Sequence, residues 1–306
     1  MLPITVQTGG LEDKYGVDTA YRMIKEAGFD GVDANICAVV PCEDLVYKHI
    51  KDSFLKGSEK DVMELFSPWK QASEKYGLPN RQAHAPFPSY IDDGNEDGSN
   101  QKIIQALIRS IHGADWIGCR NLVIHPVQVN YKFLLTPEQE WELNLSMYSQ
   151  MIPAAKEYGV TICLENLFTW DDRLLYAGCC AHPSDAAKYV DELNSVAGQE
   201  VFGFCLDTGH ANVVGEDLRN ALRVLNKRIK CFHLHDNSGH QDQHLAPYMG
   251  ALDWEHFIQG LNEIQYENTL NFETFHALEI LPEELYPDML KWIRRCGEYF
   301  CHKAGL

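Results

Sequence analysis

Eight short runs of β-type residues alternate with longer amphipathic stretches from one end of this chain to the other. In a chain of 306 residues, the alternation indicates repeated βα units around a parallel sheet. The runs are ITVQTG (4–9), GVDANI (31–36), RQAHAP (81–86), NLVIHP (121–126), VTICLEN (160–166), FGFCLDTGH (202–210), IKCFHLHDN (229–237) and TLNFETF (269–275). Eight units predict an α/β fold, a single (β/α)8 TIM barrel over residues 1–306.

An open doubly wound sheet shares this alternation and is the alternative fold. That fold usually carries a Gly-rich phosphate loop after its first strand, whereas VQTGGLEDKYG (6–16) lacks the fingerprint. Segment 92–100, DDGNEDGSN, is expected to be a solvated loop. Several expected helices begin with Pro or an acidic residue and end at Gly; they lie at 45–50, 62–77, 103–118, 137–159, 183–194, 216–228, 253–264 and 282–300.

Charge and cysteine content narrow the possible partners and the cellular compartment. The net charge of −18 disfavours nucleic acid and anionic membranes as partners. No apolar run is long enough to span a bilayer and the N-terminus lacks signal-peptide features, so a cytoplasmic protein is expected. Because the ten cysteines include no CxxC pair and Cys163, Cys205 and Cys231 lie in apolar runs, reduced core cysteines are expected.

Histidine and carboxylate side chains come late in six of the eight runs. Barrel strands end at one shared mouth, so these side chains are expected to meet there. A single late-strand His or Glu usually bonds a neighbouring loop, but several buried carboxylates without a cation would be costly, which favours a metal site. The residues, with two more from the loop after the seventh run, are His84, His125, Glu165, Asp207, His210, His233, Asp242, His244 and Glu273.

Four of these residues come from consecutive runs: Glu165, Asp207, His233 and Glu273. Three carboxylates and one imidazole suit Mn²⁺, Zn²⁺, Co²⁺ or Mg²⁺, and the absence of thiolate ligands disfavours a structural zinc ion. The sequence therefore predicts an enzyme with one divalent metal ion in a catalytic site.

With these motifs, the whole chain resembles the xylose isomerase-like barrels. This superfamily includes sugar isomerases, ketose 3-epimerases, inosose dehydratase-like proteins and the endonuclease IV type of apurinic endonuclease. GFDGVD (28–33) and GALDW (250–254) add to the resemblance. The resemblance implies that Glu165 and Glu273 face opposite sides of a bound sugar as acid and base. It also implies substrate contacts by His84, His125, His210 and His244.

A pair of glutamates placed in this way suits proton transfer next to a carbonyl group. A divalent cation that chelates the carbonyl and the adjacent hydroxyl oxygen stabilises the enediolate that forms when the proton leaves. Return of a proton to the opposite face gives an epimer, and transfer to the neighbouring carbon gives an isomer. We therefore expect an isomerase or epimerase whose partner is a small sugar, keto-sugar or cyclitol.

The mouth loops restrict the substrate further. The loop after the seventh run contains no Lys or Arg, and Lys132 and Arg173 are the main cations on the other mouth loops. Because phosphate groups are usually held by such cations or by a helix N-terminus, an unphosphorylated substrate is favoured. The arginine that ketose 3-epimerases carry shortly after the strand-seven histidine has no counterpart, because residues 238–240 are Ser-Gly-His. Phe87, Tyr90, Trp170 and Trp254 are candidates to stack on a sugar face, with ordinary packing as the alternative.

Three other functions stay open at this stage. A lyase or dehydratase on a keto-sugar or keto-glycoside would form the same enediolate and then lose a β-substituent. An apurinic endonuclease would use all nine residues to hold three zinc ions, but the loop at 236–250 contains no Lys or Arg with which to grip DNA. A barrel that only binds a sugar or a protein is disfavoured because both glutamates are present. The sequence also leaves a homo-oligomer open.

Overall fold

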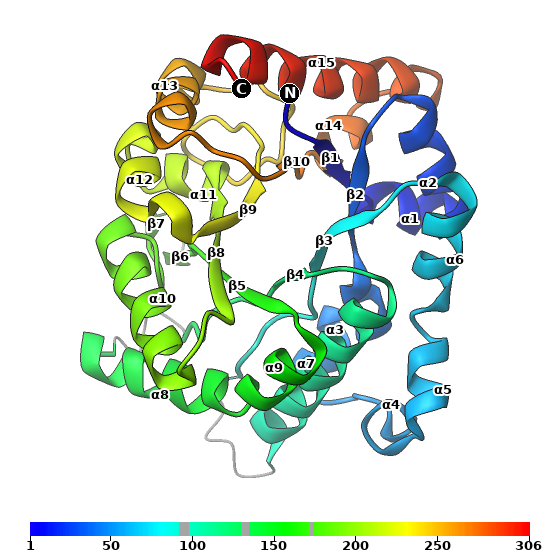
Figure 1. Cartoon of the computed structure of the whole chain (residues 1–306), viewed down its shortest axis with the longest axis vertical. Helices are drawn as coiled ribbons and strands as arrows, with labels where there is room; N and C mark the ends of the chain where they lie inside the picture. The colour runs from blue at the N-terminus through cyan, green and yellow to red at the C-terminus, as the bar shows by residue number, and fades with distance from the viewer. Residues whose placement is uncertain (92–97, 130–134, 172–173) are drawn as a thin grey trace.

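Eight parallel strands stand side by side as a ring in the computed structural model of the chain (Figure 1). The structure describes residues 1–91, 98–129, 135–171 and 174–306. The ring follows the order β10-β1-β2-β3-β4-β5-β8-β9. Its strands are β1 (Ile4–Gln7), β2 (Gly31–Ala34), β3 (Asn80–His84), β4 (Asn121–Val123), β5 (Thr161–Glu165), β8 (Phe202–Asp207), β9 (Ile229–His233) and β10 (Leu270–Phe272).

The ring closes between β9 and β10 through an isolated parallel bridge that joins Leu234 to Phe272. The Leu234 N–H donates to the Asn271 carbonyl oxygen at 2.9 Å, and the Glu273 N–H donates to the Leu234 carbonyl oxygen at 3.1 Å. The predicted (β/α)8 barrel is therefore confirmed, and the open doubly wound sheet is excluded. That residues 1–306 form one domain stays a prediction.

Helices surround the ring (Figure 1). Their apolar faces pack on the strands, as in the last helix, where Ile293, Cys296 and Phe300 are buried. The α-helices are α1 (Gly9–Tyr15), α2 (Val17–Glu26), α3 (Cys42–Val46), α4 (Asp52–Lys56), α5 (Glu59–Glu64), α6 (Ser67–Tyr76), α7 (Ser99–Trp116), α8 (Pro137–Ser149), α9 (Ile152–Tyr158), α10 (Pro183–Ala197), α11 (Thr208–Val213), α12 (Leu218–Leu225), α13 (Trp254–Ile264), α14 (Phe275–Glu279) and α15 (Tyr286–Ala304). Short 3-10 helices lie at Ile36–Val39, Asn226–Arg228 and Glu283–Leu285.

Several helix boundaries differ from the sequence-based expectation. The helix expected at 45–50 is wrong, because α3 ends at Val46. The helix expected at 137–159 is divided into α8 and α9, and Pro153 stands in the first turn of α9, where its missing N–H does no harm. The loop expected at 92–100 lies outside the described residues as far as 97, and α7 begins at Ser99.

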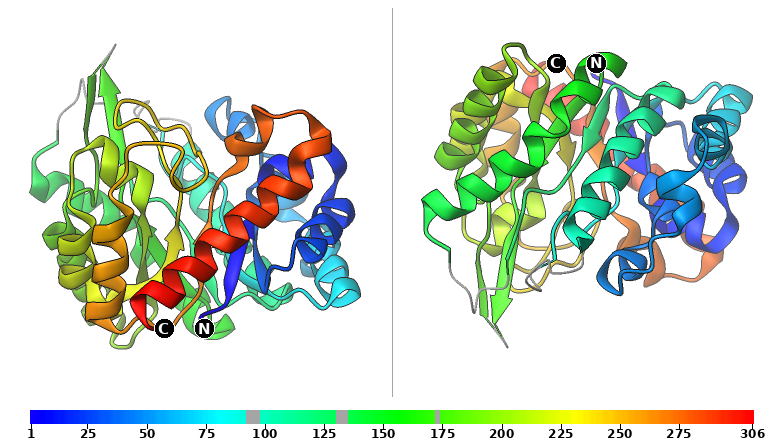
Figure 2. Two further views of the ribbon diagram at one scale, coloured as in Figure 1. Left: turned by 90° about the horizontal axis from the view of Figure 1, so that it is seen from above. Right: turned by 90° about the horizontal axis from the view of Figure 1, so that it is seen from below.

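A two-stranded antiparallel hairpin follows β5 and was not expected from the sequence. It consists of β6 (Phe168–Asp171) and β7 (Leu174–Ala177). Phe168 pairs with Ala177, and Trp170 pairs with Leu175. The hairpin projects beyond the barrel (Figure 2). Its base is fixed by two backbone hydrogen bonds, from the Leu167 N–H to the Cys179 oxygen and from the Gly178 N–H to the Leu167 oxygen, both 3.0 Å.

The cysteines behave as the sequence predicts. All ten are free thiols, and Cys163, Cys205 and Cys231 pack with Val123 as a small buried cluster. Each of the three comes two residues before a predicted metal ligand on the same strand and therefore shares its face of the strand. The thiols thus form the layer of the barrel interior directly beneath the polar residues. Among the described residues, no helix combines the length and the apolar character that a membrane span requires.

Candidate active site

The strand ends bring all nine predicted residues to one end of the barrel. His84, Glu165, Asp207 and His233 are the last residues of their strands. A cavity of about 320 Å³ opens at this end. Asp207 and His233 are fully buried behind its wall. The other seven line the cavity itself: His84, His125, Glu165, His210, Asp242, His244 and Glu273.

Glu165 lies at the centre of two groups of candidate ligands. In the first group, Glu165 Oε2 is 3.2 Å from His125 Nε2 and 3.8 Å from His84 Nε2. The two histidine Nε2 atoms are 3.1 Å apart. In the second group, His233 Nδ1 lies 3.2 Å from Glu165 Oε1 and 3.5 Å from Glu273 Oε2. Asp207 completes the second group, with Oδ2 3.9 Å from His233 Nδ1.

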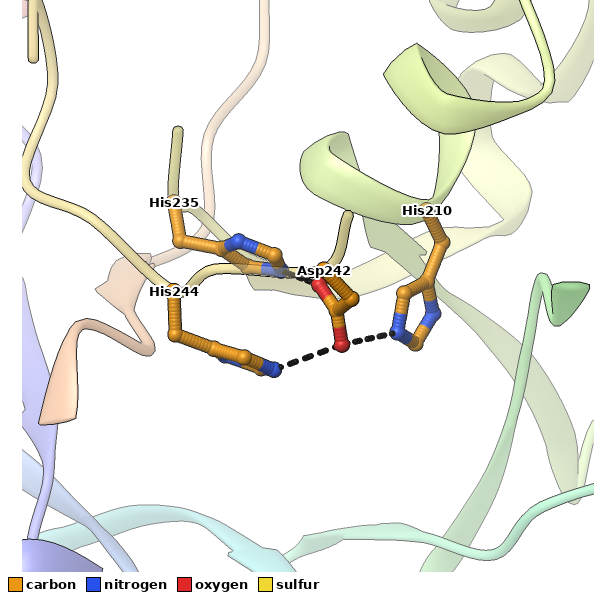
Figure 3. Close-up of side chains that lie close together, drawn as sticks. All are labelled: His210, His235, Asp242 and His244. Carbon is orange, nitrogen blue, oxygen red and sulfur yellow. Dashed lines mark hydrogen bonds and ion pairs between the residues drawn. The ribbon is translucent and has the colours of Figure 1, made fainter. Parts of the chain in front are cut away.

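A third group surrounds Asp242, which lies between three imidazoles (Figure 3). Asp242 Oδ2 is 2.9 Å from His244 Nε2 and 3.5 Å from His210 Nε2. Asp242 Oδ1 is 3.7 Å from His235 Nε2. The sequence assigned His210 and His244 to the mouth, and the structure adds His235 to the same group.

Hydrogen bonds at the far side of three rings show which nitrogen each histidine offers to the cavity. The Nδ1 atoms of His84, His210 and His244 lie 2.7, 2.9 and 3.1 Å from the backbone carbonyl oxygens of Ala85, Asn166 and Glu273. A carbonyl oxygen only accepts, so each Nδ1 carries the proton. In the neutral ring of His84, Nε2 then presents a lone pair to the other ligands, the usual arrangement of a metal-bound histidine.

The donor atoms of these groups fit a divalent cation. Two ligands at about 2.1 Å from one ion lie about 3.0 Å apart in an octahedron and about 3.4 Å apart in a tetrahedron, close to the shortest distances within the first and second groups. Among the described residues, Glu165 Oε2 and His233 Nδ1 are buried without a hydrogen-bond partner. Buried polar atoms that converge without bonding one another indicate a missing partner of positive charge.

A further set of polar residues orients the candidate ligands from behind, and the sequence reasoning missed it. Asp33 Oδ2 lies 3.3 Å from His233 Nε2, on the side of the ring away from the cavity. The same oxygen accepts hydrogen bonds from Gln82 and Asn271 at 2.9 Å each. Gln7 Nε2 donates to Glu273 Oε1 at 2.9 Å. The signal was a polar residue in the middle of an apolar run, such as Asp33 in GVDANI.

Asp207 has two structural partners as well as its place in the second group. It caps α11, and its Oδ1 accepts the His210 N–H at 2.6 Å. Its Oδ2 is 3.0 Å from His235 Nε2. A β-carbon at Gly209 would lie 1.9 Å from His235 Cε1, so the glycine in LDTGH is what allows this ring to reach Asp207.

Burial and neighbouring side chains shift the pKa values of Glu165 and Glu273 in opposite directions. Burial raises the pKa of the Glu273 carboxyl to about 7, against the opposing effect of His233 and His244. Burial also acts on Glu165, but the neighbouring His233 and His125 side chains outweigh it and hold the pKa of Glu165 well below its usual range. Burial, together with the neighbouring His125 side chain, lowers the pKa of His84 to about 3, so its ring is neutral.

The cavity surface is acidic beyond the candidate ligands. Asp13 and Glu279 also line it, and no Lys or Arg does among the described residues. Lys132 and Arg173, the cations expected on the mouth loops, lie outside the described residues. Of the candidate stacking residues, Trp254 is buried and donates from Nε1 to Asp236 at 2.9 Å, so packing is its role. Phe87 lines this cavity, whereas Tyr90 and Trp170 line a neighbouring one.

Comparison of the sequence with known families decides to which family of barrel proteins the chain belongs. The family described as xylose isomerase-like TIM barrel matches residues 21–296, which is most of the chain. The chain belongs to this family. The resemblance inferred from the strand-end motifs is thereby confirmed.

Individual relatives of this xylose isomerase-like barrel are distant. An uncharacterized protein of Methanocaldococcus jannaschii is 26% identical over 196 residues, which cover 62% of each chain. A probable endonuclease 4 of Mycoplasma pneumoniae is 24% identical over 208 residues, which cover 65% of each chain. The matches therefore span less than two thirds of the length of these two relatives.

Solved structures share the fold over the full length at low sequence identity. The 3-keto-D-glucoside 4-epimerase YcjR of E. coli superposes with a TM-score of 0.69 at 18% identity, over 97% of this chain and 100% of the other. An IOLI protein with a bound zinc atom superposes with a TM-score of 0.67 at 16% identity, over 99% of this chain and 98% of the other. At these identities the likeness concerns the fold alone.

Proposed function

We propose that this protein is a divalent-metal-dependent isomerase or epimerase that acts on a sugar, keto-sugar or cyclitol. One observation carries the proposal. Glu165 and Glu273 come from strands three positions apart in the ring, are both buried, and line the same cavity, with His233 Nδ1 within 3.2 and 3.5 Å of their oxygens. Two buried carboxylates around one imidazole, with no cation from Lys or Arg among the described lining residues, favour a bound metal ion.

The residues that would hold one such ion are Glu165, Asp207, His233 and Glu273. Oxygen and imidazole donors suit Mn²⁺, Zn²⁺, Co²⁺ or Mg²⁺. When bound, the cation supplies a Lewis acid that polarises the substrate carbonyl and stabilises the negative charge that develops as a proton leaves. Asp33 and Gln7 hold His233 and Glu273 in place.

The two glutamates move the protons. One carboxylate removes the proton from the carbon next to the carbonyl, and the other delivers a proton from the opposite side of the sugar. Delivery to the same carbon inverts it. Delivery to the former carbonyl carbon, together with transfer of the hydroxyl proton to the former carbonyl oxygen, exchanges aldose and ketose. His84, His125, His210 and His244, whose Nε2 atoms face the cavity or its neighbours, would bind the substrate hydroxyl groups. The acidic lining favours an uncharged substrate over a phosphorylated one.

Exchange of substrate hydrogen with solvent deuterium tests this chemistry directly. The metal-loaded protein is incubated in D₂O with a panel of ketoses, keto-glycosides and cyclitols, and proton NMR follows the loss of the carbon-bound hydrogen. Glu165→Gln and Glu273→Gln should each lower the exchange rate at least about a hundredfold. Glu267→Gln is the control, because Glu267 is exposed at the opposite end of the barrel, just before β10. Undiminished exchange in both site variants would reject the two-glutamate mechanism.

The same spectra separate the lyase alternative from isomerisation. A lyase would release the β-substituent and leave an unsaturated product, whereas an isomerase or epimerase conserves every substituent.

The first group and the third group of candidate ligands favour one further candidate, an apurinic endonuclease with three zinc ions. The acidic cavity opposes this candidate, because phosphate backbones are held by cationic groups.

Elemental analysis of protein purified without chelator distinguishes the two functions. About one ion per chain supports the sugar enzyme, and three zinc ions with cleavage of an abasic-site duplex would support the endonuclease. A cytoplasmic location and the absence of nucleic acid and membrane partners stay predictions, and a homo-oligomer stays open.

A further inference from the structure

A second cavity of about 450 Å³ lies beside the site cavity and is called the aromatic groove here. The two cavities share Phe87, His125 and His210 as lining residues. The shared residues place the two cavities side by side, and ligand sites commonly measure 300–1,000 Å³. The further lining residues of the groove are Cys42, Val46, Pro88, Ser89, Tyr90, Pro126, Gln128, Leu167, Phe168 and Trp170.

Aromatic rings run from the candidate ligands into this groove along two walls. On one wall, the Phe87 ring centroid lies 5.1 Å from that of His125. On the other wall, the Phe168 ring stands edge-on to His210 at 5.0 Å, and Trp170 follows at 6.1 Å from Phe168. Trp170 is 63% exposed, an unusual state for so large an apolar side chain, and it marks an unfilled contact surface.

Two polar side chains of the groove donate to the protein backbone. The Ser89 hydroxyl donates to the Pro126 oxygen at 3.1 Å, and Gln128 Nε2 donates to the Phe168 oxygen at 2.9 Å, whereas Gln128 Oε1 is buried without a hydrogen-bond partner. No Asp, Glu, Lys or Arg lines the groove among the described residues. A second sugar ring, which needs several hydrogen-bond partners, is therefore poorly matched, whereas an aromatic group is well matched.

The wall that carries Phe168 and Trp170 is anchored at its base by hydrogen bonds to the backbone. Both residues belong to β6, whose base is held by the backbone hydrogen bonds around Leu167, and Gln128 reaches across from the β4 side to the Phe168 carbonyl. A wall anchored at its base presents its rings to a ligand without a large ordering cost.

We propose that the natural substrate is a keto-glycoside with an apolar, aromatic aglycone, whose keto-sugar occupies the site cavity while the aglycone lies between Phe87 and Trp170 in the aromatic groove. The inference rests on the proposed function, since it names the substrate class of the same site. It excludes a free monosaccharide as the preferred ligand, because a monosaccharide would leave the groove unfilled.

Binding of matched glycosides tests this inference without the need for turnover. The probes are the phenyl and methyl glycosides of D-glucose, D-galactose and D-xylose in both anomeric forms, measured by calorimetry with the zinc-loaded protein. For at least one sugar, the phenyl glycoside should bind at least about tenfold more tightly than the methyl glycoside, as expected for an aromatic ring buried against two others.

Variants of the hairpin locate the preference. Trp170→Ala should reduce the ratio of the two affinities to about twofold or less while the methyl glycoside binds as before. Leu174→Ala is the matched control, because Leu174 is 62% exposed on the same hairpin but does not line the groove. Its ratio should equal that of the unmodified protein.

Three results would overturn the inference: no phenyl preference for any sugar, a preference that survives Trp170→Ala, or tighter binding of cellobiose than of the phenyl glycosides. Failure of the proposed function has a different signature. In that case the phenyl preference persists and depends on Trp170, but no keto-glycoside or ketose exchanges its hydrogen with D₂O.

Discussion

Asp236 organises the loop that carries Asp242 and His244 of the third group of candidate ligands, and its replacement by asparagine gives a sharp test of that role. The side chain is fully buried. Its Oδ1 accepts the Asn237 and Leu252 N–H groups at 2.9 and 3.1 Å, and its Oδ2 accepts the Tyr248 N–H and Trp254 Nε1–H at 3.0 and 2.9 Å. These four bonds clasp the segment from 237 to 254, within which Asp242 and His244 lie.

The cost of Asp236→Asn follows from this geometry. Whichever oxygen becomes the amide nitrogen, it faces two N–H donors and loses both hydrogen bonds. A hydrogen bond to a charged group contributes about 1.5–3 kcal/mol, so the loss of two lowers the free energy of unfolding by roughly 3–6 kcal/mol. Since whole domains are stable by about 5–15 kcal/mol, this is a large part of the total. A β-carbon at Gly250 would meet Asp236 Oδ1 at 2.3 Å, so the loop cannot easily repack around the change.

Urea denaturation followed by circular dichroism measures the effect, with the midpoint and the slope compared between variants. Asp253→Asn is the matched control, because Asp253 is an exposed helix cap whose Oδ1 accepts the His256 N–H at 3.1 Å, and asparagine caps as well as aspartate. The control should change the free energy of unfolding by less than about 0.5 kcal/mol. A loss below about 1 kcal/mol for Asp236→Asn would refute the view that this carboxylate holds the loop.

Three further predictions concern the metal, a glycine and pH. Dialysis against a chelator should lower the melting temperature by several degrees, re-addition of Zn²⁺ or Mn²⁺ should restore it, and an unchanged melting curve with metal-free protein would contradict a metal site. Gly209→Ala should displace His235 from Asp207 and reduce the metal retained per chain, as measured by elemental analysis; retention at the original level would show that the close approach is dispensable. Burial raises the pKa of the Glu12 carboxyl from 4.5 to about 8. The folded state therefore keeps a proton that the unfolded state has lost, so stability should fall as pH rises from about 4.5 to about 8. Glu12→Gln, which keeps the oxygen that accepts from Trp69 Nε1 at 2.9 Å, should flatten this slope in urea titrations at several pH values, and parallel slopes would contradict it.

The barrel and the nine polar residues could be predicted because both follow from periodicity. A strand residue such as His233 shares its face with Cys231, so an inward thiol layer implies an inward polar layer two residues later. Barrel geometry then brings the ends of all strands to one mouth. The boundary between strand β8 and helix α11, which falls at Asp207 within the run 202–210, was harder to predict, because this residue is both the last of β8 and the cap of α11.

What the sequence did not reveal depends on contacts between distant segments. Asp33 supports His233 across the barrel; its place within an apolar run signals a buried polar residue, but nothing local names His233 as its partner. The hairpin of β6 and β7 had a local signal, since FTWD and LLYA are β-type runs separated by two residues, yet Trp170 and Leu174 are exposed and so gave no core pattern. The aromatic groove arises only when this hairpin stands next to Phe87.

The contact between β9 and β10 should be sensitive to whether a ligand is bound at the adjacent candidate site. Neighbouring strands elsewhere in the described ring share two or more residue pairs, whereas this contact rests on one isolated bridge. His233 and Glu273 flank it, so a ligand held between them fastens the two margins of the ring together. Local opening of the barrel between β9 and β10 is therefore thermodynamically linked to the binding of a ligand between His233 and Glu273. The exchange of the Leu234 and Glu273 amide hydrogens should slow when an ion is held between His233 and Glu273.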